Sequence, residues 1–186
     1  MSDGIKKLAV LFPGIGYHCD KPLLYYGGKL AMQMGYAENI RLSFNCDKDK
    51  VKGKKGGIEE AFAVLYTQAK DQLKDVDWTE YDEILFLSKS IGTVVAAAYA
   101  KEKNIKCKQV FMTPLALTFA YAPKPGIAFT GTADNWVDYR IVVEECDRYG
   151  IPLQIYDNAN HSLETEDLER NLQILGDVMQ RIKSYV

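Results

Sequence analysis

The feature that most constrains this chain is a regular alternation of short apolar runs with longer stretches of helical periodicity. Six apolar runs predict strands, at residues 8–12, 40–44, 84–87, 110–112, 127–130 and 153–156. Helical patterns fall between and after them, at residues 22–34, 58–73, from 91 onward, 139–149 and 168–182. This alternation predicts an α/β fold: a parallel sheet of about six strands with helices on both faces, in three α/β/α layers.

Length and composition narrow the possibilities further. The 186 residues suffice for one well-buried core and are few for two, so we expect a single domain over residues 1–186. The net charge of −2 offers no electrostatic basis for binding nucleic acid or an anionic membrane. No apolar run approaches the roughly 20 residues of a membrane span, and no signal-peptide core precedes the first strand. We therefore expect neither nucleic acid nor membrane as a partner.

The cysteines give no sign of a disulfide framework or a metal site. Cys19, Cys46, Cys107 and Cys146 are widely separated and show neither C-x-x-C nor zinc-ligand spacing. A domain of this size does not need disulfides to fold. We therefore expect a reducing, cytoplasmic location and no bound metal.

The segment from residue 84 to residue 95 carries the clearest chemical signal. Its apolar strand passes into a helical pattern through Ser88-Lys-Ser90-Ile-Gly92, which has the small-x-Ser-x-Gly form of a nucleophile elbow. Such a turn needs small residues two before and two after the serine, and here Ser88 stands where glycine is more usual. It exposes the Ser90 hydroxyl and directs the backbone N–H of Ile91 toward an oxyanion. The alternative interpretation is a serine that caps the following helix in a non-catalytic protein.

A nucleophilic serine needs a base, and the chain has only two histidines, His18 and His161. His161 follows the last predicted strand, in Asn160-His161-Ser162. Open parallel sheets place their sites at the carboxyl ends of strands, where Ser90 would also lie. The sequence therefore favours His161 as the base.

An acid that orients the base is expected at the same edge. Asp134 directly follows a predicted strand and a glycine turn, in Gly131-Thr-Ala-Asp134. Asp138 and Asp157 also lie near strand ends and remain alternatives for this role. We favour Asp134 because it alone follows strand and turn directly.

These motifs together resemble those of a small α/β-hydrolase fold protein, over nearly the whole chain. The elbow, the acid turn and the histidine loop occur in that family's order, and Phe-Pro-Gly-Ile-Gly at residues 12–16 is similar to its oxyanion loop. The resemblance implies that the N–H groups of Ile15, Gly16 and Ile91 form an oxyanion hole. It also implies a minimal member that lacks the family's first two strands and, because residues 113–124 are too few for a cap domain, has an open cleft.

The function that we expect is hydrolysis of an ester or thioester through a Ser90–His161–Asp134 triad and an acyl-enzyme. The partner would be a small-molecule acyl substrate, and this chemistry needs no metal or organic cofactor. Two alternatives use the same scaffold. One is a non-catalytic binding protein of α/β-hydrolase type, and the other is an acyltransferase or lyase.

Side chains near these motifs are candidates for the substrate pocket. Tyr17 and His18 lie in the expected oxyanion loop, and Trp136 follows the acid turn. His18 could instead hold its loop in shape through hydrogen bonds. Cys19 beside His18 is a poor alternative nucleophile, because adjacent side chains in an extended loop diverge.

Two further patterns indicate ligand binding only weakly. Lysines at positions 48, 50, 52, 54 and 55 could form an anion site, but a solvated loop is the simpler interpretation. The segment from Gly14 to Cys19 has two glycines of a dinucleotide-binding turn, with cysteine where the third glycine is needed. Neither pattern displaces the serine motif as the main signal.

Overall fold

The sheet agrees with the predicted α/β class. The structure, a computed structural model, describes residues 4–46, 51, 54, 56–121, 123 and 125–186. Its strands are β1 (Lys7–Phe12), β2 (Glu38–Arg41), β3 (Glu83–Lys89), β4 (Lys108–Met112), β5 (Gly126–Gly131) and β6 (Leu153–Tyr156). They form one six-stranded sheet in the order β2-β1-β3-β4-β5-β6, and every neighbouring pair is parallel. The prediction of a six-stranded parallel sheet is confirmed.

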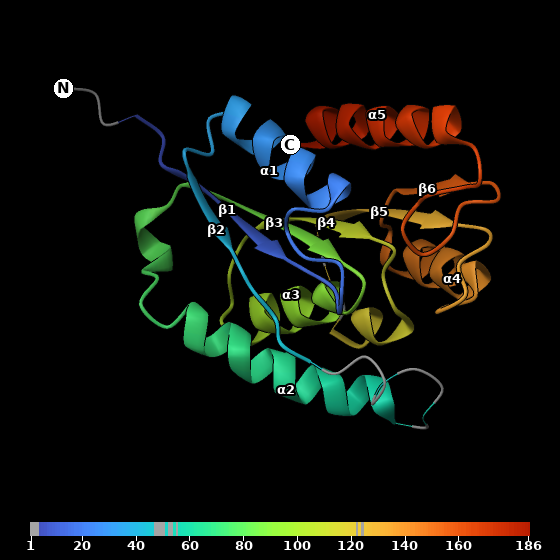
Figure 1. Ribbon diagram of the computed structural model, residues 1–186. Helices are drawn as coiled ribbons and strands as arrows, with labels where there is room; N and C mark the ends of the chain where they lie inside the picture. The colour runs from blue at the N-terminus through green and yellow to red at the C-terminus, as the bar shows by residue number, and fades with distance from the viewer. Residues whose placement is uncertain (1–3, 47–50, 52–53, 55, 122, 124) are drawn as a thin grey trace.

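Helices cover both faces of this sheet, as Figure 1 shows. One face carries α1 (Pro22–Gln33) and α5 (Leu168–Tyr185). The other carries α2 (Gly57–Gln72), α3 (Ile91–Glu102) and α4 (Tyr139–Tyr149), with the short 3-10 helices η2 (Trp78–Glu80) and η3 (Ala116–Tyr121). The result is the expected three-layer α/β/α sandwich. Within the described residues, no helix is long and apolar enough to cross a membrane.

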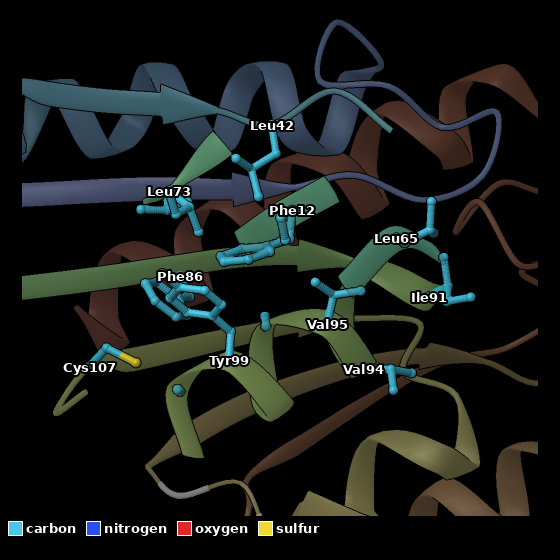
Figure 2. Close-up of a cluster of buried hydrophobic side chains, with 14 of the residues drawn as sticks. Phe12, Leu42, Leu65, Leu73, Phe86, Ile91, Val94, Val95, Tyr99 and Cys107 are labelled. Carbon is cyan, nitrogen blue, oxygen red and sulfur yellow. The ribbon is translucent and has the colours of Figure 1, made fainter. Parts of the chain in front are cut away.

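The core lies on both sides of the central strands, because alternate residues of a strand face opposite layers. Phe12 of β1 and Phe86 of β3 point to the α2/α3 side, with their ring centroids 4.8 Å apart (Figure 2). Leu85 and Leu87 point to the α1/α5 side. With apolar side chains on both faces, β3 has the composition of a central parallel strand.

One strand differs from its prediction. The expected strand at residues 40–44 is β2, which starts and ends earlier and pairs with β1 from Leu8↔Glu38 to Leu11↔Arg41. Beyond it, the side-chain amide of Gln72 binds both the N–H and the carbonyl of Ser43, at 2.9 Å each. The segment therefore pairs with α2 instead of extending the ladder. Of the basic stretch that follows, Lys48, Lys50, Lys52 and Lys55 lie outside the described residues.

The turn from β3 into α3 depends on a glycine that packs against β1. A methyl group added at Gly92 would overlap the carbonyl oxygens of Phe12 and Pro13, which are backbone atoms that cannot rotate away. Gly176 on the exposed side of α5 has no atom within 4 Å of the same position.

Gly92→Ala is expected to lower the free energy of unfolding by about 3 kcal/mol or more, because the β1–α3 contact must open. The matched variant Gly176→Ala is expected to raise it by about 0.5–1 kcal/mol through better helix propensity. Urea unfolding followed by circular dichroism measures both. Equal stability of Gly92→Ala and the parent would contradict this packing.

Candidate active site

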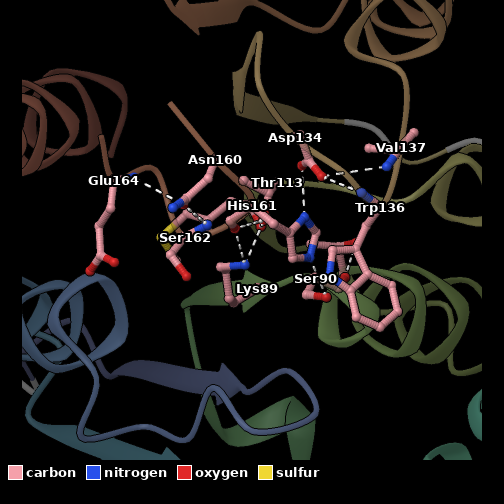
Figure 3. Close-up of polar contacts among 12 residues, drawn as sticks. Lys89, Ser90, Thr113, Asp134, Trp136, Val137, Asn160, His161, Ser162 and Glu164 are labelled. Atoms are coloured by element: carbon pink, nitrogen blue, oxygen red, sulfur yellow. Dashed lines mark hydrogen bonds and ion pairs between the residues drawn. The ribbon is translucent and has the colours of Figure 1, made fainter. Parts of the chain in front are cut away.

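Three side chains from separate loops meet at the carboxyl edge of the sheet. Ser90 follows β3, Asp134 follows β5 and His161 follows β6. Ser90 Oγ lies 2.7 Å from His161 Nε2, and His161 Nδ1 lies 2.7 Å from Asp134 Oδ2 (Figure 3). The structure thus brings the three predicted residues into one hydrogen-bonded chain.

The backbone of Ser90 adopts a conformation that non-glycine residues rarely use. Its φ of 57° and ψ of −129° allow β3 to change into α3 within one residue. The Ser90 N–H donates to the Met112 carbonyl at 3.0 Å, while the hydroxyl makes no capping bond to α3. The Ser90 hydroxyl is therefore not used to cap α3, although Ser90 occupies the N-cap position. Ser88 is accommodated because its hydroxyl donates to the Val110 carbonyl at 2.7 Å.

The Asp134 carboxylate is held from two sides and fixes the tautomer of His161. Its side chain is fully buried, and Oδ1 accepts from the N–H groups of Trp136 at 2.8 Å and Val137 at 3.4 Å. Because a carboxylate only accepts, His161 Nδ1 must carry the hydrogen in that bond. Nε2 of the neutral ring is then free to accept the Ser90 hydroxyl proton.

The two alternative acids are placed elsewhere. Asp138 caps α4 by accepting from the Arg140 N–H at 3.0 Å, and it pairs with the Arg140 guanidinium. Asp157 is exposed. Neither hydrogen-bonds to His161, so the geometry favours Asp134.

The loop after β1 forms a tight turn beside Ser90. Hydrogen bonds between Gly14 and Tyr17, at 3.0 and 3.3 Å, close the turn and leave Ile15 and Gly16 at its tip. A Cβ at Gly14 would lie 3.0 Å from Ser90 Cβ, so the turn packs directly on the serine. Ile91 is the first residue of α3, where an N–H has no acceptor within the helix. The three expected oxyanion-hole residues line the same cavity as Ser90.

A cavity of about 460 Å³ opens over Ser90 and His161. Besides Ser90 and His161, its walls combine apolar and polar side chains: Ile15, Gly16, Tyr17, Val51, Ile58, Lys89, Ile91, Leu115, Asn135, Trp136, Asn160 and Ser162. The Trp136 ring lies 5.7 Å from the His161 ring, centroid to centroid. Tyr17 and Trp136 thus occupy the predicted pocket.

The prediction that His18 lines this cavity is wrong. The chain leaves the Gly14–Tyr17 turn toward solvent, and the His18 side chain is 63% exposed. Its Nδ1 accepts from the Asp20 N–H at 3.3 Å and lies 3.6 Å from the Asp20 carboxylate. His18 thus shapes its own loop, which is the alternative role.

Cys19 does not have the properties of a nucleophile. Its thiol donates to the Leu42 carbonyl at 3.4 Å, and burial raises its pKa to about 11. No cluster of three or more His, Cys, Asp or Glu side chains in the described part of the chain is arranged to hold a metal ion. Ser90 is therefore the candidate nucleophile of this edge.

A lysine that the sequence analysis did not single out lies beneath the site. Lys89 is 1% exposed, and its ammonium donates to Thr113 Oγ1 and to the His161 carbonyl, both at 2.6 Å. Burial lowers the pKa of Lys89 to about 7, against the attraction of Asp134 and Glu164. Burial and then the Lys89 charge lower the pKa of His161, which the Asp134 carboxylate opposes. The period-2 pattern Leu85, Leu87, Lys89 is the signal that could have placed this side chain inside.

Comparisons with known proteins agree with this architecture. No family model matches the sequence, and no curated protein matches it either. Solved structures do match: Est1E from Butyrivibrio proteoclasticus has a TM-score of 0.66 at 12% identity, over 99% of this chain and 88% of that one. The chain has the α/β-hydrolase fold.

Two further structures with this fold are similar over almost all of the chain. The Pyrococcus furiosus esterase Pf2001 has a TM-score of 0.68 at 16% identity, over 98% of this chain and 81% of that one. An α/β serine hydrolase without a lid from Xanthomonas campestris has a TM-score of 0.61 at 11% identity, over 100% of this chain and 86% of that one. At such low identity the likeness concerns the α/β-hydrolase fold alone, and the chemistry must be argued from the site.

The buried ammonium predicts a specific pH dependence of stability. Between pH 7 and about 10.5 the unfolded chain keeps a proton on Lys89 that the folded chain releases, so the parent becomes more stable as pH rises. Lys89→Met has no such titrating group, so it does not gain this stability. The free energy of unfolding of Lys89→Met minus that of the parent is therefore expected to fall by about 2 kcal/mol from pH 7 to pH 9.

Urea unfolding at pH 7, 8 and 9 measures this difference. Lys101→Met, at an exposed lysine of α3, is the control and is expected to follow the parent at every pH. A Lys89→Met curve parallel to the parent's would show that the folded protein holds Lys89 at an ordinary pKa.

Proposed function

We propose that this protein is a serine hydrolase that cleaves a small ester or thioester. The observation that carries the proposal is the hydrogen-bonded chain from Ser90 through His161 to Asp134, with both links at 2.7 Å. The α/β serine hydrolases and esterases among the similar structures support the same class of reaction. The apolar side chains in the cavity wall, among them Ile58, Leu115 and Trp136, support a substrate with a small acyl group.

The first half of the proposed reaction forms an acyl-enzyme. His161 Nε2 accepts the hydroxyl proton of Ser90 while Ser90 Oγ bonds to the substrate carbonyl carbon. The carbonyl π bond breaks and places its electron pair on oxygen. Asp134 holds the imidazole in orientation and stabilises its protonated form. The tetrahedral intermediate then expels the alcohol or thiol, which takes the proton from His161.

The oxyanion is stabilised by backbone N–H groups in this proposal. Ile91 and Ile15 supply the donors, with Gly16 beside them at the tip of the β1 turn. Each such donor contributes on the order of 3 kcal/mol to the transition state in serine hydrolases. Because the turn packs directly on Ser90 through Gly14, these donors are fixed before substrate arrives.

The second half releases the acid. A water molecule enters the open cavity. His161 Nε2 takes a proton from this water while the water oxygen bonds to the acyl carbon. The second tetrahedral intermediate collapses, the ester bond to Ser90 breaks, and His161 returns the proton to Ser90 Oγ. An alcohol or amine acceptor in place of water would make the protein an acyltransferase. Product analysis with and without added acceptor separates the two.

Covalent labelling tests the nucleophile. A fluorophosphonate probe is expected to label the parent, and Ser90→Ala is expected to abolish labelling and to lower ester turnover by at least about 10³-fold. Ser162→Ala, at another cavity serine, is the matched control and is expected to keep the label. Intact-protein mass spectrometry and peptide mapping locate it. Labelling of Ser90→Ala at another residue, or an unreactive parent, would reject the proposal.

The three candidate acids can be separated by conservative substitution. Asp134→Asn is expected to lower kcat about 10³- to 10⁴-fold, because the amide cannot hold the required tautomer or stabilise the imidazolium. Asp138→Asn and Asp157→Asn, which leave His161 untouched, are expected to stay within about threefold of the parent. Hydrolysis of p-nitrophenyl acetate at pH 8 is the measurement. A large loss in Asp157→Asn with an active Asp134→Asn would reassign the acid.

A further inference from the structure

Lys89 occupies a position that the strand pattern reserves for a core residue. Leu85 and Leu87 precede it on the same face of β3, which packs against α1 and α5. The Lys89 ammonium is enclosed, with the Tyr17 ring centroid 4.8 Å away as its third neighbour. Among the described residues it has no carboxylate within 4.0 Å. A buried cation without an ion-pair partner is costly, so its retention calls for a role.

This ammonium contacts the His161 carbonyl both directly and through the Thr113 hydroxyl. Lys89 Nζ donates to the His161 carbonyl, and Thr113 Oγ1, which also accepts from Lys89, lies 3.1 Å from the same carbonyl. Thr113 holds a left-handed φ of 49°, an unusual conformation that places its hydroxyl there. The main chain of His161 is thereby attached to the ends of β3 and β4 (Figure 3).

Lys89 and Ser90 are consecutive, so the turn between β3 and α3 contacts His161 at two points. Ser90 Oγ meets the imidazole at Nε2, and Lys89 Nζ meets the backbone carbonyl of the same residue. On its other side the loop is closed by Asn160, whose Oδ1 accepts from the N–H groups of Ser162 at 2.7 Å and Glu164 at 3.2 Å. Adjacent residues of this turn thus contact both the backbone and the imidazole of His161.

The charges around the imidazole act in opposite directions. The Asp134 carboxylate favours the protonated ring, and the Lys89 ammonium disfavours it. Glu164 and Asp134 attract the Lys89 charge, and the Tyr17 hydroxyl, whose pKa burial raises to about 12, stays neutral. Lys89 is thus the one cation that acts on His161 among the described residues.

We propose that Lys89 is a positioning residue for the base: its amino group, protonated or neutral, holds the His161 carbonyl through a hydrogen bond, and in the protonated form its charge favours the neutral, proton-accepting imidazole. This inference rests on the proposed role of His161 as the base. Without Lys89, the ring would take up a proton at higher pH and would lie less well aligned with Ser90.

Titration of His161 by NMR tests the charge without needing turnover. The chain has two histidines, so His18→Gln assigns the two imidazole Cε1–H signals. Lys89→Met and Lys89→Gln are expected to raise the pKa of His161 by about one unit, a typical effect of removing a nearby charge. Lys101→Met is the control and is expected to leave it unchanged. A rise below about 0.5 unit in a folded neutral variant would overturn the electrostatic role.

Kinetics test the positioning role. Lys89→Met is expected to lower kcat about 10- to 100-fold at pH 8 with KM little changed, since misalignment affects chemistry more than binding. Lys89→Gln, which can still donate a hydrogen bond to the His161 carbonyl, is expected to show a smaller decrease in kcat. In both variants the acidic limb of kcat/KM is expected to move to higher pH. An unchanged kcat in Lys89→Met would overturn the positioning role.

The remaining outcomes are also decisive. If both neutral variants fail to fold, Lys89 is a folding residue and the proposal is wrong. If the pKa of His161 rises in the variants while the parent neither reacts with fluorophosphonate nor turns over esters, the charge effect stands and the hydrolase function fails. The two proposals can therefore fail separately.

Discussion

The close contact between the β3–α3 turn and the end of β1 is the constraint on which the site depends. Gly92 allows the first turn of α3 to touch the carbonyl groups of Phe12 and Pro13, and Gly14 allows the β1 turn to touch Ser90. With side chains at these positions, strand and helix would separate. These two packing contacts flank Ser90, whose backbone holds a rare conformation, and the second sets the β1 turn beside it.

A second close approach brings the acid and the base together. A methyl group at Gly131 would overlap the Ala159 carbonyl, and that carbonyl accepts from the Ala133 N–H at 3.0 Å. The loops after β5 and β6 are thus joined by backbone contacts within a few residues of Asp134 and His161. Side chains contributed by distant parts of the chain reach hydrogen-bonding distance because rigid backbone positions them.

The buried lysine shows how one charge can serve both geometry and acid–base balance. A hydrophobic residue at position 89 would satisfy the strand pattern and avoid desolvation. The ammonium instead binds the carbonyl of the residue whose ring must accept a proton. Because Lys89 is almost fully buried, its charge acts on its neighbour with less screening than a surface charge would.

The sequence by itself determined the α/β class, the six strands and the chain order of serine, aspartate and histidine, because periodicity and turn chemistry are local properties. Tertiary structure decided the rest. It ended β2 at Arg41, because the backbone of Ser43, two residues on, is hydrogen-bonded to the side-chain amide of Gln72. It also turned His18 to solvent and joined Lys89 to a carbonyl 72 positions away in the sequence. These outcomes depend on which loops meet across the sheet edge, and no local pattern encodes such contacts.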